Sequence, residues 1–202
     1  MLGQAALAMW WDIEPALRAE FEDWHTHEHM PERLAIPGFL RGSRWIARSG
    51  EPSYFVLYEA SELAVLTGGA YLERLNNPTP WSRKMMPHHR NMVRSVCQVR
   101  ATIGRGLPQS LATIRFSGTQ RIGRLPQRQG LTGASLLQSQ PLTGIHTTEQ
   151  KIRGGDASAD WVTLIGGYDA DALNAVLKDE LALLGGGAGG VYRLGYSLLP
   201  NE

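Results

Sequence analysis

Two segments of this 202-residue chain repeat one another, and this internal repeat constrains the fold more than any other feature. Residues 58–63 read YEASEL and residues 168–173 read YDADAL, so each joins an apolar run to a run of helix-forming residues. A weaker echo links residues 7–9 (LAM) to residues 111–113 (LAT), about one hundred positions further on. The repeat predicts two units of similar architecture within one chain.

The order of apolar runs and turn signals in the first half indicates a ferredoxin-like unit. Strands are predicted over residues 4–12, 39–47, 54–60 and 92–102, where apolar or β-prone residues dominate. Helices are predicted over 14–30 and 62–74, and NNPTP at 76–80 should end the second one. Residues 81–90 are expected to form a loop or a short helix. This order is β-α-β-β-α-β.

The second half repeats the outline in a degenerate form. A helix is predicted over 171–184, ending at three consecutive glycines, with a closing strand over 190–199. Residues 120–129 are too short and too basic to duplicate the first helix. We therefore divide the chain into an N-terminal unit, 1–104, with the active site, and a C-terminal unit, 105–202, that is mainly scaffold.

Each unit would expose one apolar sheet face, and such a face must be covered. Packing the two four-stranded sheets against each other within the chain satisfies this requirement. The predicted fold class is α+β, with two tandem ferredoxin-like units closed into an intrachain α/β barrel.

Composition restricts the partners. The formal net charge is +1 and no basic run occurs, which argues against a nucleic-acid partner bound through phosphates. No apolar stretch is long enough to span a membrane. The lone Cys97 cannot form an internal disulfide, which is typical of a reducing compartment. We expect a cytoplasmic protein, monomer or homodimer, whose partner is a small-molecule substrate.

The first predicted helix carries the chemistry. At 100° per residue, Glu28 continues the apolar stripe that Phe21 and Trp24 form, and a carboxylate is costly to bury there unless it is paired or protonated. His25 and His29 lie one turn apart beside it, so two imidazoles and a carboxylate can converge. A partly buried Glu with a raised pKa beside a histidine can shuttle protons near neutral pH. His25, Glu28 and His29 are the predicted catalytic residues.

Two other interpretations of this segment stay open. His25, Glu28 and His29 spell H-x-x-E-H, which matches a zinc motif in form, but no third protein ligand is evident, so no metal site is predicted. Alternatively, Glu28 pairs with Arg33 or Arg44 and the histidines lie on a solvated face. Pro31 is expected to disrupt the helix near Met30.

Further candidate residues could bind substrate. They are tryptophans that could form an apolar wall, two tyrosines on one face of a strand, arginines near the helix, and histidines in a segment broken by prolines. These residues are Trp24, Arg33, Arg44, Tyr54, Tyr58, Trp81, His88 and His89.

The run Trp24-His25-x-x-Glu28-His29-x-Pro31-Glu32-Arg33, followed by IPGF at 36–39 and by Arg44, resembles the dimeric α/β-barrel superfamily, especially EthD-like proteins. The resemblance covers residues 1–102 and includes the strand end at Tyr58 and residues 76–81. It implies two ferredoxin-like units in a barrel, with a cleft between helices and sheet. The superfamily includes cofactor-free cyclases, isomerases, lyases and monooxygenases, and haem enzymes, for which His88, His89 or His146 could be the axial ligand.

The leading hypothesis is a cofactor-independent enzyme of lyase, isomerase or cyclase type. It would use His/Glu acid–base chemistry on a small apolar carbonyl or aromatic compound, with Arg33 or Arg44 holding an oxyanion. The alternatives are a non-catalytic ligand-binding or stress-response module, and a haem- or metal-dependent oxidoreductase.

Overall fold

Eight antiparallel strands close into a barrel in the computed structural model, which describes residues 1–48, 52–117, 128–140 and 147–201. The strands follow one another around the barrel in the order β1-β3-β2-β8-β5-β7-β6-β4. Their bounds are β1 Ala5–Asp12, β2 Phe39–Ala47, β3 Tyr54–Ala60, β4 Arg90–Ile103, β5 Ser110–Phe116, β6 Leu131–Ser139, β7 Trp161–Gly167 and β8 Ala188–Leu198. The predicted closure of an α+β barrel within one chain is confirmed.

The two halves of the chain occupy opposite sides of this barrel. The first four strands lie in the order β4-β1-β3-β2 and the last four in the order β8-β5-β7-β6. Antiparallel pairing of β2 with β8 and of β4 with β6 joins the halves. The expected boundary between residues 104 and 105 falls in the connection between β4 and β5.

Alternation along the strands sorts the core into one inner and two outer clusters. Even-numbered residues of β1, such as Ala8 and Trp10, point into the barrel, whereas Leu7, Met9 and Trp11 lie on its outer face. Cys97 is buried inside the barrel, as expected of a small core residue. The LAM/LAT echo is therefore out of register: Leu7 faces outward, but Leu111 faces the interior, because a shift of one residue changes the face.

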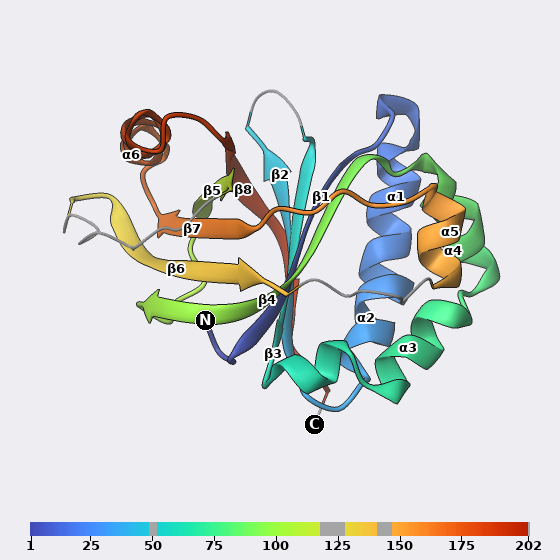
Figure 1. Ribbon diagram of the computed structural model, residues 1–202. Coiled ribbons are helices and arrows are strands. Elements are labelled where there is room, and N and C mark those ends of the chain that lie inside the picture. The colour runs from blue at the N-terminus through green and yellow to red at the C-terminus, as the bar shows by residue number, and fades with distance from the viewer. Residues whose placement is uncertain (49–51, 118–127, 141–146, 202) are drawn as a thin grey trace.

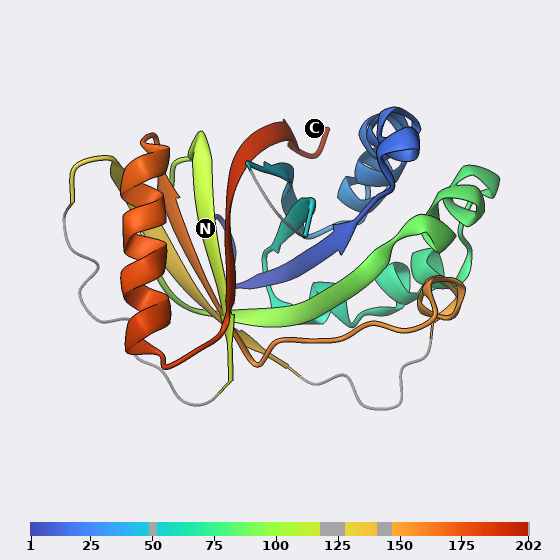
Figure 2. The same cartoon turned by 90° about the horizontal axis from the view of Figure 1, so that it is seen from above.

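Helices cover the two outer clusters very unequally. On the N-terminal side lie the helices α1 Arg18–Trp24, α2 Met30–Leu34, α3 Gly69–Asn76, α4 Pro80–Met85 and α5 Thr148–Arg153. In the part of the chain that the structure describes, the other side is covered by α6, Ala170–Leu183, and Figures 1 and 2 show this helix across the barrel from the others. In the described residues, no helix is long and apolar enough to cross a membrane.

Capping residues explain why α6 begins where the sequence predicts. Asp169 accepts hydrogen bonds from the backbone N–H groups of Asp171 and Ala172, and glycines with positive φ begin at Gly185. The helix predicted over 62–74 is instead a 3₁₀ turn, Leu63–Leu66, followed by α3. The basic segment 120–129, expected not to duplicate the first helix, lies largely outside the described residues.

The first helix continues past Pro31, contrary to the prediction that it ends near Met30. A π-helical turn, His25–His29, joins α1 to α2, and the N–H of Met30 donates to the carbonyl of His25. Pro31 then stands in the first turn of α2, where the N–H that proline lacks has no intrahelical partner in any case. The π turn therefore lets the helix continue to Leu34.

The buried end of β1 provides a test of this arrangement. Asp12 accepts hydrogen bonds from the Ser53 backbone N–H (2.6 Å), the Ser53 hydroxyl (2.8 Å) and the Asn91 amide (3.0 Å). We expect Asp12→Ala to lower the free energy of unfolding by about 3 kcal/mol, because three donors lose their charged acceptor. Urea denaturation measures this change.

Asp23→Ala is the matched control, because Asp23 is exposed and, among the described residues, its carboxylate pairs only with exposed His27. Its free energy of unfolding should change by no more than about 0.5 kcal/mol. Equal losses in both variants would contradict the role given to Asp12.

Candidate functional site

A small cavity lies between the N-terminal helices and the outer face of β1, β3 and β4. The volume that the centre of a water molecule can reach in this cavity is about 30 Å³. This volume is enough for about two waters. Its apolar wall comes from Leu7, Met9 and Trp11 of β1, together with residues of α3 and β4. Its polar lining comprises His25, His29, Arg33, Tyr58, Tyr71, His89, Arg94, Glu149 and Arg153.

The π turn brings two histidines to the same wall. The ring centroids of His25 and His29 are 5.5 Å apart, and Trp24 packs on His29 at 4.5 Å. His89 enters from the segment after α4 and packs against Trp11 at 4.9 Å. π turns inside α-helices occur frequently at functional sites.

All three imidazoles are uncharged at neutral pH. Burial is the main cause, because it lowers the pKa of His25 and of His29 well below 6.5. The charge of Arg44 lowers the pKa of His25 further, and the charge of Arg33 lowers that of His29. Burial also lowers the pKa of His89, to about 3. The histidines can therefore accept protons only when something changes their electrostatic environment.

Four side chains of the lining carry a fully buried polar atom with no hydrogen-bond partner among the described residues. These atoms are Trp11 Nε1, His25 Nδ1, His29 Nδ1 and Arg33 Nη1. An unpartnered buried polar atom costs about 1–3 kcal/mol. Such a concentration of unused hydrogen-bonding capacity around one cavity is what a ligand with polar atoms would satisfy.

Arg33 is held by an ion pair that crosses between the two halves of the chain. It is 2% exposed and donates to Glu149 of α5, which is 3% exposed. Burial opposes the charge on Arg33, but Glu149 and then nearby tyrosines raise its pKa overall. Arg153 lies 3.7 Å from Glu149 and forms a second pair with Asp156 at 2.8 Å. The cavity thus keeps excess positive charge beside its neutral histidines.

Six predicted site residues line this cavity: Trp24, His25, His29, Arg33, Tyr58 and His89. Tyr58 and Tyr54 share the outer face of β3, as predicted, but only Tyr58 reaches the cavity, where its hydroxyl lies 3.5 Å from Nε2 of His25. His146, the remaining histidine considered as a haem ligand, lies outside the described residues.

Glu28 does not join the histidines, contrary to the predicted convergence. Its Oε1 accepts hydrogen bonds from Thr79 (2.5 Å), Trp24 Nε1 (3.2 Å) and Ser82 (3.5 Å). Thr79 is the N-cap of α4. The π turn changes the helical periodicity that placed Glu28 on the same face, so its carboxylate fixes the start of α4 instead of lining the cavity.

Four further predicted residues also lie outside the cavity lining. Arg44 donates to the carbonyl of Glu22 (3.0 Å) and to Thr26 (3.1 Å), and the Tyr54 hydroxyl donates to Glu22 (2.8 Å). Both fasten the first helix to the sheet. Trp81 is partly buried against the outer cluster of the N-terminal side, and His88 is partly exposed.

Sequence reasoning missed Trp11, Tyr71, Arg94, Glu149 and Arg153. Two of these come from α5, so the C-terminal half is not only scaffold with respect to the cavity. The one local signal was the sequence TTEQ at 147–150, in which Thr147 caps α5 by accepting from the N–H of Gln150. This signal predicts a helix, but it cannot show where that helix packs.

The described residues contain no group of three or more His, Cys, Asp or Glu side chains placed to hold a metal ion. With Glu28 bound to Thr79, the H-x-x-E-H motif does not direct its three side chains to one point.

Comparison with known proteins identifies the fold but no family. No protein-family model and no curated protein matches the chain. Among solved structures, an anthrone oxidase-like protein superposes with a TM-score of 0.65 at 9% identity, over 98% of this chain and 93% of that one. A putative monooxygenase from Fusobacterium nucleatum subsp. nucleatum gives 0.56 at 8% identity, over 98% and 96%. The chain shares the fold of these proteins; the resemblance to EthD-like proteins stays a prediction.

The buried neutral histidines make stability depend on pH. A histidine whose folded pKa lies below its unfolded value of about 6.5 binds fewer protons in the folded state, so its stabilising effect is lost as pH falls below that value. For His89 the loss continues down to about pH 3. Each such imidazole contributes up to about 1.4 kcal/mol per pH unit to this slope.

We therefore expect His89→Leu to show a shallower decrease in the free energy of unfolding between pH 6.5 and pH 4.5 than the wild type. Urea denaturation at several pH values measures the slopes, and carboxylate titration cancels in the comparison. His88→Leu is the control, because His88 is partly exposed. Identical slopes for His89→Leu and the wild type would show that His89 titrates normally in the folded state.

Proposed function

We propose that this protein is an enzyme that transfers protons on a small carbonyl or aromatic compound without a cofactor, by lyase, isomerase or cyclase chemistry. The observation that carries the proposal is the set of unpartnered buried polar atoms on His25, His29 and Arg33, all bordering one cavity. Active sites commonly combine a closed apolar pocket with a few convergent polar groups of perturbed pKa.

Arg33 is the residue that would recognise the substrate. Its Nη1 is the unused donor of a guanidinium whose Nη2 is already bound to Glu149. A carbonyl oxygen that gains negative charge as a proton leaves the neighbouring carbon would be stabilised by this donor. Arg33 would therefore favour the enolate or phenolate form of a bound compound.

The same contact would activate the histidines. After burial, the Arg33 charge is one of the causes that lower the pKa of His29 and of His25. Negative charge developing on the substrate opposes this effect and raises both values, so an imidazole becomes a better proton acceptor as the anion forms. His25 and His29 would accept and return the proton, and Glu28 would act as a positioning residue through Trp24 and Thr79.

Aromatic and sulfur-containing walls define the rest of the substrate. Trp11 and Trp24 flank the histidines, and Met9, Met86 and Met92 complete an adaptable apolar lining. Methionine side chains adjust to planar ligands of different outline, so an aromatic ketone fits the chemistry better than a sugar or a phosphate. One structural neighbour is named an anthrone oxidase-like protein, and an anthrone is a compound of this chemical class.

We also propose that the chain consists of two tandem ferredoxin-like units of EthD-like type. The matching orders β4-β1-β3-β2 and β8-β5-β7-β6 support this interpretation, as does the place of α6 after the third strand of its half. The second unit would have lost its own site, and its α5 would complete the site of the first.

The second candidate function is non-catalytic binding of a small molecule in the same cavity. It is favoured by the small space for water-sized molecules, about 30 Å³, and by the existing Glu149 counter-ion of Arg33. In that case the histidines would serve only as hydrogen-bonding groups.

Carbon-bound proton exchange tests the enzymatic proposal directly. The purified protein is incubated in D₂O with 2-tetralone, a small aromatic ketone, and loss of the α-proton signal is followed by NMR. We expect catalysed exchange in the wild type, and a rate reduced about 100-fold or more in His25→Asn or His29→Asn. Glu28→Gln should retain most of the rate, because the glutamine amide oxygen can still accept the hydrogen bonds by which Glu28 positions Trp24 and Thr79. Exchange that is equally fast in the histidine variants, or saturable binding with no exchange, would contradict the enzymatic proposal.

The role of Arg33 can be separated from its effect on folding. Arg33→Met leaves Glu149 buried without its main partner and should lower the free energy of unfolding by about 3–5 kcal/mol. The double variant Arg33→Met/Glu149→Leu removes both charges and should recover most of that stability, but not the exchange activity. Recovery of exchange in the stable double variant would show that Arg33 is only structural.

A further inference from the structure

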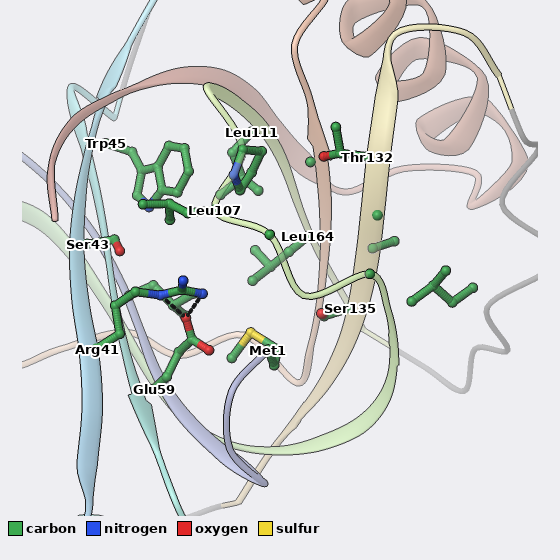
Figure 3. A pocket seen from close by; sticks show the side chains of 18 residues that line it. Met1, Arg41, Ser43, Trp45, Glu59, Leu107, Leu111, Thr132, Ser135 and Leu164 are labelled. Atoms are coloured by element: carbon green, nitrogen blue, oxygen red, sulfur yellow. Dashed lines mark hydrogen bonds and ion pairs between the residues drawn. The ribbon is translucent and has the colours of Figure 1, made fainter. Parts of the chain in front are cut away.

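A second cavity lies inside the barrel, on the opposite face of the sheet from the histidine cavity. It reaches into the barrel from the connection between β4 and β5, where Ile103 and Leu107 are exposed, and the centre of a water molecule can reach about 60 Å³ of it. Its deep wall is formed by Trp45, Leu57, Leu111 and Leu164, which belong to the inner cluster. In Figure 3, Trp45, Ser43 and the Arg41–Glu59 pair lie on one side of it, with Leu164, Ser135 and Thr132 on the other.

The two charged side chains at this cavity, Arg41 and Glu59, compensate each other. Arg41 donates from Nε to Oε1 of Glu59 at 2.7 Å, and its Nη2 lies 2.5 Å from the same oxygen. The other carboxylate oxygen of Glu59 accepts from the backbone N–H of Leu2 at 2.5 Å. The Met1 amino group also borders the cavity, and partial burial lowers its pKa and so disfavours its charged form, which makes an uncharged ligand the better match for this lining.

The buried hydroxyl groups of the lining are also engaged. The Ser43 and Ser197 hydroxyls lie 3.1 Å apart, and Ser197 in turn donates to the carbonyl of Gly42 at 3.1 Å. The hydroxyls of Ser135 and Thr102 lie 3.1 Å apart. These contacts leave the indole of Trp45 as the distinctive polar group of the cavity.

Trp45 is 1% exposed, and its Nε1 has no hydrogen-bond partner among the described residues. Trp10, the other tryptophan of the inner cluster, provides the comparison, because its Nε1 donates to Thr113 at 3.1 Å. A buried indole N–H normally finds an acceptor. At Trp45 the acceptor would have to come from whatever occupies the cavity.

We propose that the barrel interior is a second binding site, which takes a small, uncharged, mainly apolar molecule with one hydrogen-bond acceptor, such as a ketone. The acceptor receives the Trp45 N–H, and the apolar part packs on Leu57, Leu111 and Leu164. The β-sheet itself separates this site from the histidine cavity, so the two can be occupied independently.

NMR of the indole N–H groups in ¹⁵N-labelled protein tests the proposal with cyclohexanone as the probe. Methylenecyclohexane is the matched control, since it has the same shape and no oxygen. We expect cyclohexanone to shift the Trp45 resonance saturably and methylenecyclohexane to bind more weakly. Trp45→Phe identifies the resonance by its loss, and it should weaken ketone binding about threefold to tenfold, as expected for one hydrogen bond.

Contacts between ketone protons and the methyl groups of Leu111 and Leu164, detected by nuclear Overhauser effects in the wild type, test the site even if Trp45→Phe does not fold. Shifts confined to the indoles of Trp11 and Trp24 would place the ketone in the histidine cavity and overturn the proposal. The absence of any saturable shift up to the solubility limit of cyclohexanone would also overturn it.

Discussion

The structure depends on burying both faces of a sheet that has no free edges. In the closed barrel, the inner sheet faces of the two halves pack against each other. Trp10, Trp45 and Phe55 are therefore buried inside without contact from a described helix. The outer faces then need separate covers. Among the residues that the structure describes, one long helix, α6, covers the C-terminal side, whereas five shorter helices cover the N-terminal side, and shorter helices leave space between them. Figure 2 shows these shorter helices together on one side of the barrel. The histidine cavity lies beneath them.

Within that cavity, a charged arginine lies beside imidazoles that are kept neutral. Arg33 is charged because Glu149 compensates it, and the histidines are neutral because they are buried near arginines. The arrangement costs stability, since several donors lack partners. Such local conflicts in a well-packed protein are typical of functional sites, where the compensating gain comes from a ligand.

Much of the fold could be predicted from the sequence because strand patterns and turn signals are local. β2 and β3 begin and end at the predicted residues, and the caps of α6 are visible in the sequence. The site was harder to predict from the sequence than the fold. The closeness of His25 and His29 follows from helical spacing, and Arg33 was predicted only as an arginine near the helix. The orientation of Glu28 depends on a π turn, for which the sequence gives no clear signal. Glu149 and Arg153 follow Arg33 by more than one hundred residues along the chain, and only tertiary packing brings α5 to the cavity.

The π turn also has a consequence for the evolution of such a chain. A π turn contains one residue more than an α-helical turn, and it can be read as a single inserted codon that the helix has absorbed. Loss of that codon would restore a regular helix and rotate everything after it by about 100° relative to α1. Arg33 would then leave its place opposite Glu149, while the barrel would keep all of its strands. Fold and site in this architecture can therefore diverge by one short deletion, so descendants of a common ancestor can share the barrel without sharing the chemistry.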